Sequence, residues 1–154
     1  PLADQPQGLN PKMLVRCLYA SRARQPLVPA TTDAILEQSR RNNPPRGVTG
    51  LLCYVDDVFV QVLEGGRDPV CDLFATIVRD DRHHSVRLLV YEEIGERRFG
   101  HWNMGQVNIA KVNTALLLKY SEKAVLDPFA VSGAATLALL HELVDTAQIA
   151  TRGA

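Results

Sequence analysis

The sequence predicts an α+β fold of the ferredoxin-like type, with its elements in the order β-α-β-β-α-β-β. Short apolar runs bounded by polar residues or glycine alternate with longer stretches of helical periodicity. Two of the runs are separated only by Asp56-Asp57, which is typical of a β-hairpin. Two helices should therefore lie on one face of the sheet, and the strands that each helix joins should lie side by side in parallel through right-handed connections.

The first half of the chain contains a strand, a helix and a hairpin. Residues 1–12 lack the pattern of a signal peptide and are expected to be a flexible arm or an expression remnant. The apolar run 14–19 predicts a strand that ends before polar residues. The stretch 29–41 predicts a helix, because it opens with a proline and is followed by Asn-Asn-Pro-Pro, where the prolines cannot continue a helix. The two hairpin strands are predicted at 50–55 and 58–63.

The second half begins with the clearest helical pattern. Asp68 is the expected N-cap and Pro69 the first helical residue. The apolar residues at helical spacing that follow are Val70, Leu73, Phe74, Ile77 and Val78. Residues 86–91 predict a fourth strand and residues 102–107 a fifth.

The C-terminal tail differs in character from the preceding domain. Residues 112–120 predict a short helix, and Asp127-Pro128 then breaks the chain. A second amphipathic helix is indicated by apolar residues at Ala134, Leu137, Leu140, Val144 and Ala147. An open sheet has two faces, so this two-helix cap is expected on the face opposite the first two helices. The predicted division is a 13–107 domain followed by a 108–150 cap that serves as output segment.

Composition limits the classes of function. The chain has 154 residues, 46% hydrophobic and 22% charged, which suits one packed domain. The 17 basic and 17 acidic residues cancel, so a nucleic-acid or membrane-surface partner is not expected. No apolar run approaches the roughly 20 residues that cross a bilayer. Cys17, Cys53 and Cys71 are odd in number and lie in apolar runs, which predicts buried free thiols and a cytoplasmic location.

Two polar residues stand out on the predicted strands. Gln61 alternates with Phe59 and Leu63, so its amide points to an apolar face. Leaving a buried amide unpaired costs about 1–3 kcal/mol. Gln61 should therefore meet either a polar group of the protein or a ligand. Tyr19 would reach it across the sheet if their two strands are neighbours.

Other polar residues gather at the ends of the two helices. Asn42 and Asn43 either simply end the first helix or face the end of the second, at 79–84, across a cleft. The adjacent His83 and His84 point apart and lack a third ligand at recognisable spacing, so no metal site is predicted. No nucleophile and base at recognisable spacing and no phosphate-binding loop is found, so the chain is not expected to be an enzyme.

Taken together, these residues resemble the BLUF family, sensors of blue light using FAD. The linked motifs that carry the resemblance are Tyr19 with Ser21, the block 42–54 (NNPPRGVTGLLCY), 61–65 (QVLEG), 79–85 (RDDRHHS) and 98–104 (RFGHWNM). The resemblance covers about residues 13–107. Residues 118–121 extend it into the tail of short, stand-alone BLUF proteins.

The resemblance implies an FAD site between the two helices. The apolar residues that would flank or line the isoalloxazine ring are Ile35, Ile77, Leu52 and Phe59. The polar residues that would contact its edges or the ribityl end are Asn42, Asn43, Asp80, Arg82 and His83, with Asn43 on the C4=O and N3 edge. Where some relatives carry a basic or imidazole group one turn before Asp80, this chain has Thr76.

The resemblance also implies a photochemical switch formed by Tyr19, Gln61, Asn43, Ser21, Trp102 and Met104. Tyr19 would give an electron and a proton toward the flavin, and Gln61 would rotate or tautomerise. The hydrogen bonds to flavin N5 and C4=O would change, which shifts the absorption slightly to the red. Trp102 and Met104, expected on the fifth strand, would exchange at the flavin site and relay the change to the tail.

A separate effector protein is expected, either response-regulator-like or related to cyclic dinucleotides. Short BLUF proteins often form ring-like oligomers, which implies a homo-oligomer here. Two alternatives belong to other classes. A ferredoxin-like hydrolase of the acylphosphatase type would use Asn43 and Arg82 to orient a phosphate, and a light-insensitive assembly module would keep the fold without photochemistry.

Overall fold

A computed structural model describes residues 13–146. Its elements in chain order are β1 (Leu14–Ala23), α1 (Pro29–Arg46), β2 (Thr49–Val55), β3 (Val58–Gly66), α2 (Arg67–Val78), β4 (His83–Glu93), β5 (Gly105–Asn108), the 3-10 helix η3 (Ile109–Lys111), α3 (Thr114–Tyr120) and α4 (Gly133–Asp145). The expected arm 1–12 and Ala147 lie outside the described residues.

The five strands form one sheet in the order β4-β1-β3-β2-β5. β3 is antiparallel to both β1 and β2, β4 is antiparallel to β1, and β5 is parallel to β2. This arrangement confirms the ferredoxin-like fold. The prediction that strands joined by a helix lie side by side is wrong, because β3 separates β1 from β2 and β1 separates β3 from β4. The central positions belong to β1 and β3, whose residues are almost all buried.

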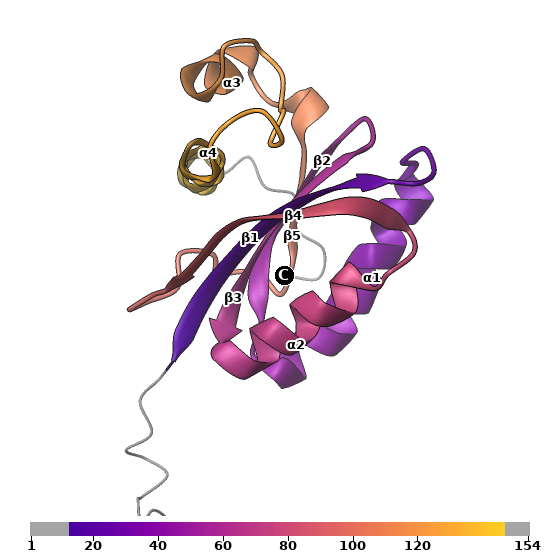
Figure 1. The fold of residues 1–154 in the computed structure, drawn as a ribbon, viewed down its shortest axis with the longest axis vertical. Helices are drawn as coiled ribbons and strands as arrows, with labels where there is room; N and C mark the ends of the chain where they lie inside the picture. The colour runs from indigo at the N-terminus through magenta and orange to yellow at the C-terminus, as the bar shows by residue number, and fades with distance from the viewer. Residues whose placement is uncertain (1–12, 147–154) are drawn as a thin grey trace, which may run out of the picture.

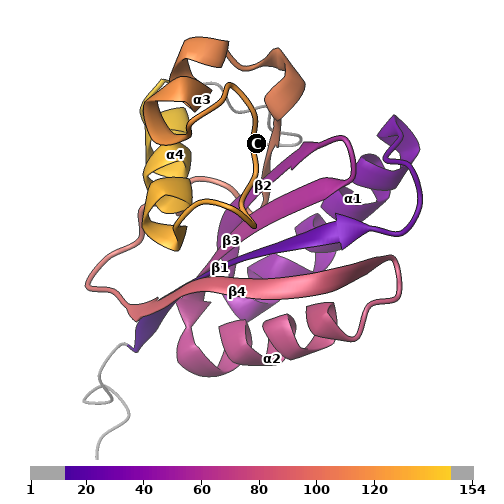
Figure 2. The same cartoon turned by 45° about the horizontal axis from the view of Figure 1, so that its top comes forward.

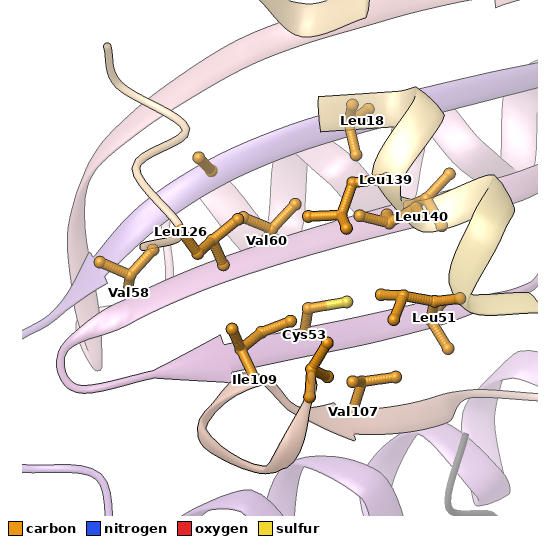
Figure 3. Close-up of a cluster of buried hydrophobic side chains, with 14 of the residues drawn as sticks. Leu18, Leu51, Cys53, Val58, Val60, Val107, Ile109, Leu126, Leu139 and Leu140 are labelled. Atoms are coloured by element: carbon orange, nitrogen blue, oxygen red, sulfur yellow. The ribbon is translucent and has the colours of Figure 1, made fainter. Parts of the chain in front are cut away.

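The sheet separates α1 and α2 on one face from α3 and α4 on the other (Figures 1 and 2), and a hydrophobic core lies on each side. Alternate residues of each strand point to opposite faces, so Cys17 packs toward α1 and α2 while Leu18 packs toward the cap. Figure 3 shows Leu139 and Leu140 of α4 above strand residues of the cap-side core. The expected two-helix cap on the second face is confirmed.

Helix α1 is longer than predicted. It was expected to end near Arg41, but it continues through Pro44 and Pro45 to Arg46. Prolines lack the N–H of the helical ladder, yet they lie in the last turn, where they cost only two helical hydrogen bonds. Gly47 then ends the helix in the left-handed conformation, with φ 68°. Its N–H bonds to the carbonyl of Pro44 at 3.0 Å, and that of Val48 bonds to the carbonyl of Asn43 at 3.0 Å.

Several other boundaries differ from those predicted. β1 runs on to residue 23 and β4 spans residues 83–93, because paired neighbours keep polar residues in the sheet. β5 is shorter, so Trp102 and Met104 precede it rather than lie on it. The N-cap of α2 is Gly66, and Asp68 lies in the first turn, where a carboxylate favours the helix dipole. α3 starts two residues later than predicted.

Two of the three cysteines match their prediction. Cys17 and Cys53 are buried free thiols, whereas Cys71 is an exposed free thiol on the side of α2 that faces Tyr91 of β4. Burial raises the pKa of the Cys17 thiol to about 12, so it stays protonated at neutral pH. No helix within residues 13–146 is long and apolar enough to cross a membrane.

Candidate functional site

A cleft lies between α1, α2 and the helix-side face of the sheet. It encloses about 890 Å³ of space, part of it open to solvent. Every residue predicted to contact the cofactor lines it, together with Tyr19: Ile35, Asn42, Asn43, Leu52, Phe59, Gln61, Ile77, Asp80, Arg82 and His83. The cleft therefore brings together residues from β1, α1, β2, β3, α2 and the start of β4.

The floor of the cleft holds a chain of three buried side chains. Tyr19 and Gln61 are direct partners in the β1–β3 register. The Tyr19 hydroxyl donates to Oε1 of Gln61, and Nε2 of Gln61 donates to Sδ of Met104 at 3.3 Å. Tyr19 and Gln61 are 4% and 5% exposed. Burial raises the pKa of Tyr19, so its hydroxyl is a hydrogen-bond donor over the physiological range.

The segment before β5 places Met104 and Trp102 differently. Met104 is buried in the helix-side core against the floor of the cleft. Trp102 is half-buried, and its ring packs edge-on against His101 at 5.6 Å. Neither residue is among those that line the cleft. Two hydrogen bonds to its carbonyl groups hold the segment: the Gly50 N–H donates to the carbonyl of Trp102 at 3.2 Å, and the side-chain Nδ2 of Asn43 donates to the carbonyl of Asn103 at 2.9 Å.

Ser21 lies behind the cleft wall rather than in it. Its Oγ is 2.7 Å from Nδ1 of His83, and Nε2 of His83 is 2.6 Å from the carbonyl of Ile77. A carbonyl only accepts, so Nε2 carries a proton and donates to Ile77, while Nδ1 shares a hydrogen bond with the Ser21 hydroxyl. Ser21 thus joins β1, β4 and the end of α2, and it orients the histidine that faces the cleft.

The open end of the cleft is polar. Arg82 pairs with Asp80 at 2.6 Å and reaches Oε1 of Gln38 at 3.3 Å. Its hydrogen bonds lower the pKa of Asp80, and the same contact raises the pKa of Arg82. Both groups are therefore charged at neutral pH, and the guanidinium is held at the mouth.

Five further residues that line the cleft were not predicted to bind: Gln38, Ser39, Arg46, Leu73 and Thr76. A signal for them was present in the sequence. Counting helical positions from Ile35 leads to residues 38, 39, 42 and 46, and counting from Leu73 leads to 76, 77 and 80. The same helical stripe that carried the predicted residues carries these as well.

The arrangement suits a planar, largely uncharged ring. Apolar side chains from both helices and from the sheet form the walls, and the polar groups at the floor are the Tyr19 hydroxyl and the Gln61 amide, which are held by their hydrogen bond. Within residues 13–146, no cluster of three or more His, Cys, Asp or Glu side chains is placed to hold a metal ion.

Comparison with known proteins shows the family of the chain. Residues 14–105 match the model of the family described as BLUF, sensors of blue-light using FAD. The chain belongs to the BLUF family. Over 92 residues it is 34% identical to the photoactivated adenylate cyclase subunit beta of Euglena longa. That match covers 59% of this chain and 11% of the cyclase subunit, so the chain spans only a small part of that relative.

Solved structures of BLUF proteins match nearly the whole chain. The dark-state structure of BlrB, a BLUF protein, has a TM-score of 0.74 at 32% identity and covers 88% of this chain and 98% of BlrB. The photo-activated state of BlsA has a TM-score of 0.75 at 31% identity and covers 86% of this chain and 95% of BlsA. BlrP1 of Klebsiella pneumoniae, solved with FMN and cyclic diGMP, has a TM-score of 0.64 at 29% identity. That match covers 88% of this chain and 35% of BlrP1.

Proposed function

We propose that this BLUF protein is a blue-light receptor that holds FAD non-covalently in the cleft between α1 and α2. The observation that carries the proposal is the buried chain of contacts Tyr19–Gln61–Met104 at the cleft floor. A bound flavin supplies absorption of blue light and the capacity to accept an electron. The residues around the cleft bind it, and the floor residues convert its excitation into a structural change.

Flavin binding would depend on cleft residues that α1, α2 and the sheet already hold in place. Ile35 and Ile77 face the cleft from the two helices, and Leu52 and Phe59 face it from the sheet. Asn43 is fixed by its bond to the carbonyl of Asn103, which leaves its amide oxygen to accept. Arg82 at the mouth would contact the polar chain of the cofactor, and FAD is proposed over FMN because the family is described by FAD.

The switch would be the Gln61 amide. Its two ends are unlike, because the oxygen accepts from Tyr19 and the nitrogen donates to Met104. Tyr19 would give an electron and a proton toward the bound flavin, and the amide would rotate or tautomerise while the electron and proton return to Tyr19. After rotation Nε2 faces Tyr19, whose oxygen accepts, and Oε1 faces the Met104 sulfur. A thioether sulfur has no proton to donate, so the contact with Met104 is lost.

Loss of that contact would release Met104 and the segment before β5, and Trp102 would move toward the cleft. β5 pairs with β2 and leads directly into η3 and the cap. We therefore propose residues 108–146 as the output segment. It would act on a separate effector, response-regulator-like or related to cyclic dinucleotides, and the receptor would form a homo-oligomer. The relatives named for an adenylate cyclase and for cyclic diGMP support nucleotide signalling as the setting.

The test is an absorption spectrum of the purified protein in the dark, directly after blue light, and through recovery. We expect a yellow protein with a small, reversible red shift. Heat-released cofactor separated by chromatography then distinguishes FAD from FMN. Gln61→Leu should bind flavin without showing the shift. A normal shift in Gln61→Leu would contradict the switch, and a protein that stays colourless after incubation with FAD would contradict the whole proposal.

The acylphosphatase alternative is less well supported. It requires Asn43 and Arg82 to bind a phosphate, but the Asn43 amide nitrogen donates to the Asn103 carbonyl and Arg82 is paired with Asp80. The assembly-module alternative predicts a flavin-free or light-insensitive protein, so the same spectrum separates it from the receptor.

A further inference from the structure

A second hollow lies on the helix side of the sheet, between α2 and the edge strand β4. It encloses about 820 Å³, much of it open to solvent, and apart from Arg79 it is lined by apolar and sulfur side chains and the ring of Tyr91. Three side chains at its rim are well exposed: Val78 at 48%, Leu88 at 55% and Tyr91 at 43%. An apolar groove with an exposed rim of this kind marks an interaction surface.

The groove runs along a free sheet edge. Within residues 13–146, β4 pairs only with β1, so its outer backbone groups have no strand partner. β4 is 11 residues long and contains neither proline nor lysine. Such an edge is a template for pairing with another strand.

A bulge in β4 arranges its side chains in an unusual way. Leu18 lies opposite Val90, but Tyr19 lies opposite Leu88, so Leu89 is an extra residue in β4. Leu88 and Tyr91 therefore point to the same face although they are three residues apart, and both line the groove. Leu89 and Val90 both pack on the cap side.

This pattern makes the edge self-complementary. If two copies of β4 run antiparallel with a twofold axis between Leu89 and Val90, Leu88 of each copy lies opposite Tyr91 of the other. Arg87 then lies opposite Glu92 of the other copy, on the cap-side face in both. Arg87 forms no ion pair within residues 13–146. Glu92 accepts from Nη1 of Arg16 at 2.7 Å, but its side chain is 41% exposed, so the carboxylate can also accept from a second guanidinium. A shift of one residue in either direction would break these two pairs, because it places Leu88 opposite Glu92 or Arg87 opposite Tyr91.

We propose that two copies of this chain associate through their β4 edges in this register, joining the two sheets into one and covering the rims of both grooves. The occupant is a second copy because the sequence of β4 itself supplies both members of each pair, Leu88 with Tyr91 and Arg87 with Glu92, when the strand is repeated about a twofold axis. The proposal rests on the homo-oligomer part of the proposed function and is independent of the photochemistry.

The first test is the mass of the full, flavin-loaded chain by sedimentation over a concentration series. We expect a dimer that Leu88→Lys dissociates, with the dissociation constant raised about tenfold or more because a twofold interface carries the change twice. Leu118→Lys is the matched control, since Leu118 on α3 is 52% exposed and lies outside the groove. Its dimer should be unchanged.

The register is tested at Arg87. Arg87→Glu places a carboxylate opposite Glu92 and should weaken the dimer, whereas Arg87→Lys should leave it intact. The light-induced red shift, measured on each sample, should be unaltered, so a failed photoreceptor and a failed interface are distinguishable.

Three outcomes would overturn the proposal. The first is a monomer at every concentration, and the second is a dimer that resists Leu88→Lys. The third is a monomer whose β4 amides are nevertheless protected from hydrogen exchange, which means that another part of the chain covers the edge.

Discussion

Tyr19 has a hydrogen bond that its surroundings cannot replace. Its hydroxyl is the donor to Gln61 Oε1, and both side chains are buried. Tyr19→Phe keeps the ring but leaves the amide oxygen without its donor. Removing one partner of a buried hydrogen bond costs about 1–3 kcal/mol.

We therefore expect Tyr19→Phe to bind flavin, to lose about 1–3 kcal/mol of unfolding free energy, and to show no reversible red shift. Urea unfolding measures the first effect and absorption before and after blue light the second. A full red shift in this variant would show that the phenol is not part of the switch.

Glu64 connects β3 to the segment that leads to Met104. It is fully buried, three residues after Gln61, and accepts from Nε of Arg16 at 2.7 Å. It also accepts the backbone N–H groups of Arg98 at 2.9 Å and Phe99 at 2.6 Å. One carboxylate thus satisfies a buried guanidinium and two backbone donors of an irregular segment.

Glu64→Gln should be among the most destabilising single-atom changes in the protein. The neutral amide removes the negative charge that pairs with the buried Arg16 guanidinium and turns its NH₂ toward an N–H donor, which costs about 3–5 kcal/mol. Arg16 keeps only its ion pair with the partly exposed Glu92. Urea unfolding measures the loss. Glu93→Gln is the control, because Glu93 forms its ion pair with Arg67 at the exposed surface and should cost under about 1 kcal/mol. Equal losses in the two variants would contradict the role of Glu64.

Helix α4 packs on this segment through a histidine. The His141 ring lies 5.4 Å from that of Phe99. Burial lowers the pKa of His141, and the positive charges of Arg16 and Arg98 lower it further against the opposing effect of Glu64 and Asp145. The native state thus favours the neutral ring, and the unfolded state takes up a proton first as pH falls.

His141 therefore makes the folded protein less stable as pH falls. The stability that His141 contributes is complete above its unfolded pKa of about 6.5 and is lost as pH falls from there toward the lower native value. Urea unfolding between pH 8 and pH 5 should show this loss in the wild type. Subtracting the profile of His141→Gln isolates the residue, and identical slopes in both proteins would contradict the assignment.

The cap is seated on the sheet at one close backbone approach. A Cβ at Gly133, the first residue of α4, would lie 2.4 Å from the carbonyl oxygen of Leu89. Real side chains do not reach this distance, so Gly133→Ala must move α4 away from β4. The cap-side core, with Leu139, Leu140 and Leu143, would be disturbed.

We expect Gly133→Ala to lower the unfolding free energy by about 1–3 kcal/mol through overpacking, measured by urea unfolding. Flavin binding should persist, because the cleft lies on the other face of the sheet. Gly95→Ala is the control, since a Cβ there meets nothing within 4 Å. A stable Gly133→Ala protein would mean that α4 is not held as tightly as the packing indicates.

Local pattern was enough for much of the fold and for most of the site. Strand alternation placed Gln61 on the face of Phe59 and Leu63, and helical spacing identified the apolar stripe of α2. The resemblance to BLUF proteins selected residues that all prove to line one cleft, apart from Ser21, Trp102 and Met104. The prolines misled the prediction of where α1 ends, because the helix keeps Pro44 and Pro45 in its last turn at the loss of two hydrogen bonds and ends one residue after them.

What the sequence by itself determined are properties of neighbours along the chain: element type, buried faces, and the family to which the motifs belong. Only the tertiary structure decided the strand order β4-β1-β3-β2-β5, the pairing of Tyr19 with Gln61, and the place of Glu64 under residues 98 and 99. These contacts join residues far apart in the chain. Their geometry depends on how whole elements pack against one another. The spacing of apolar residues within a single strand or helix does not determine that packing.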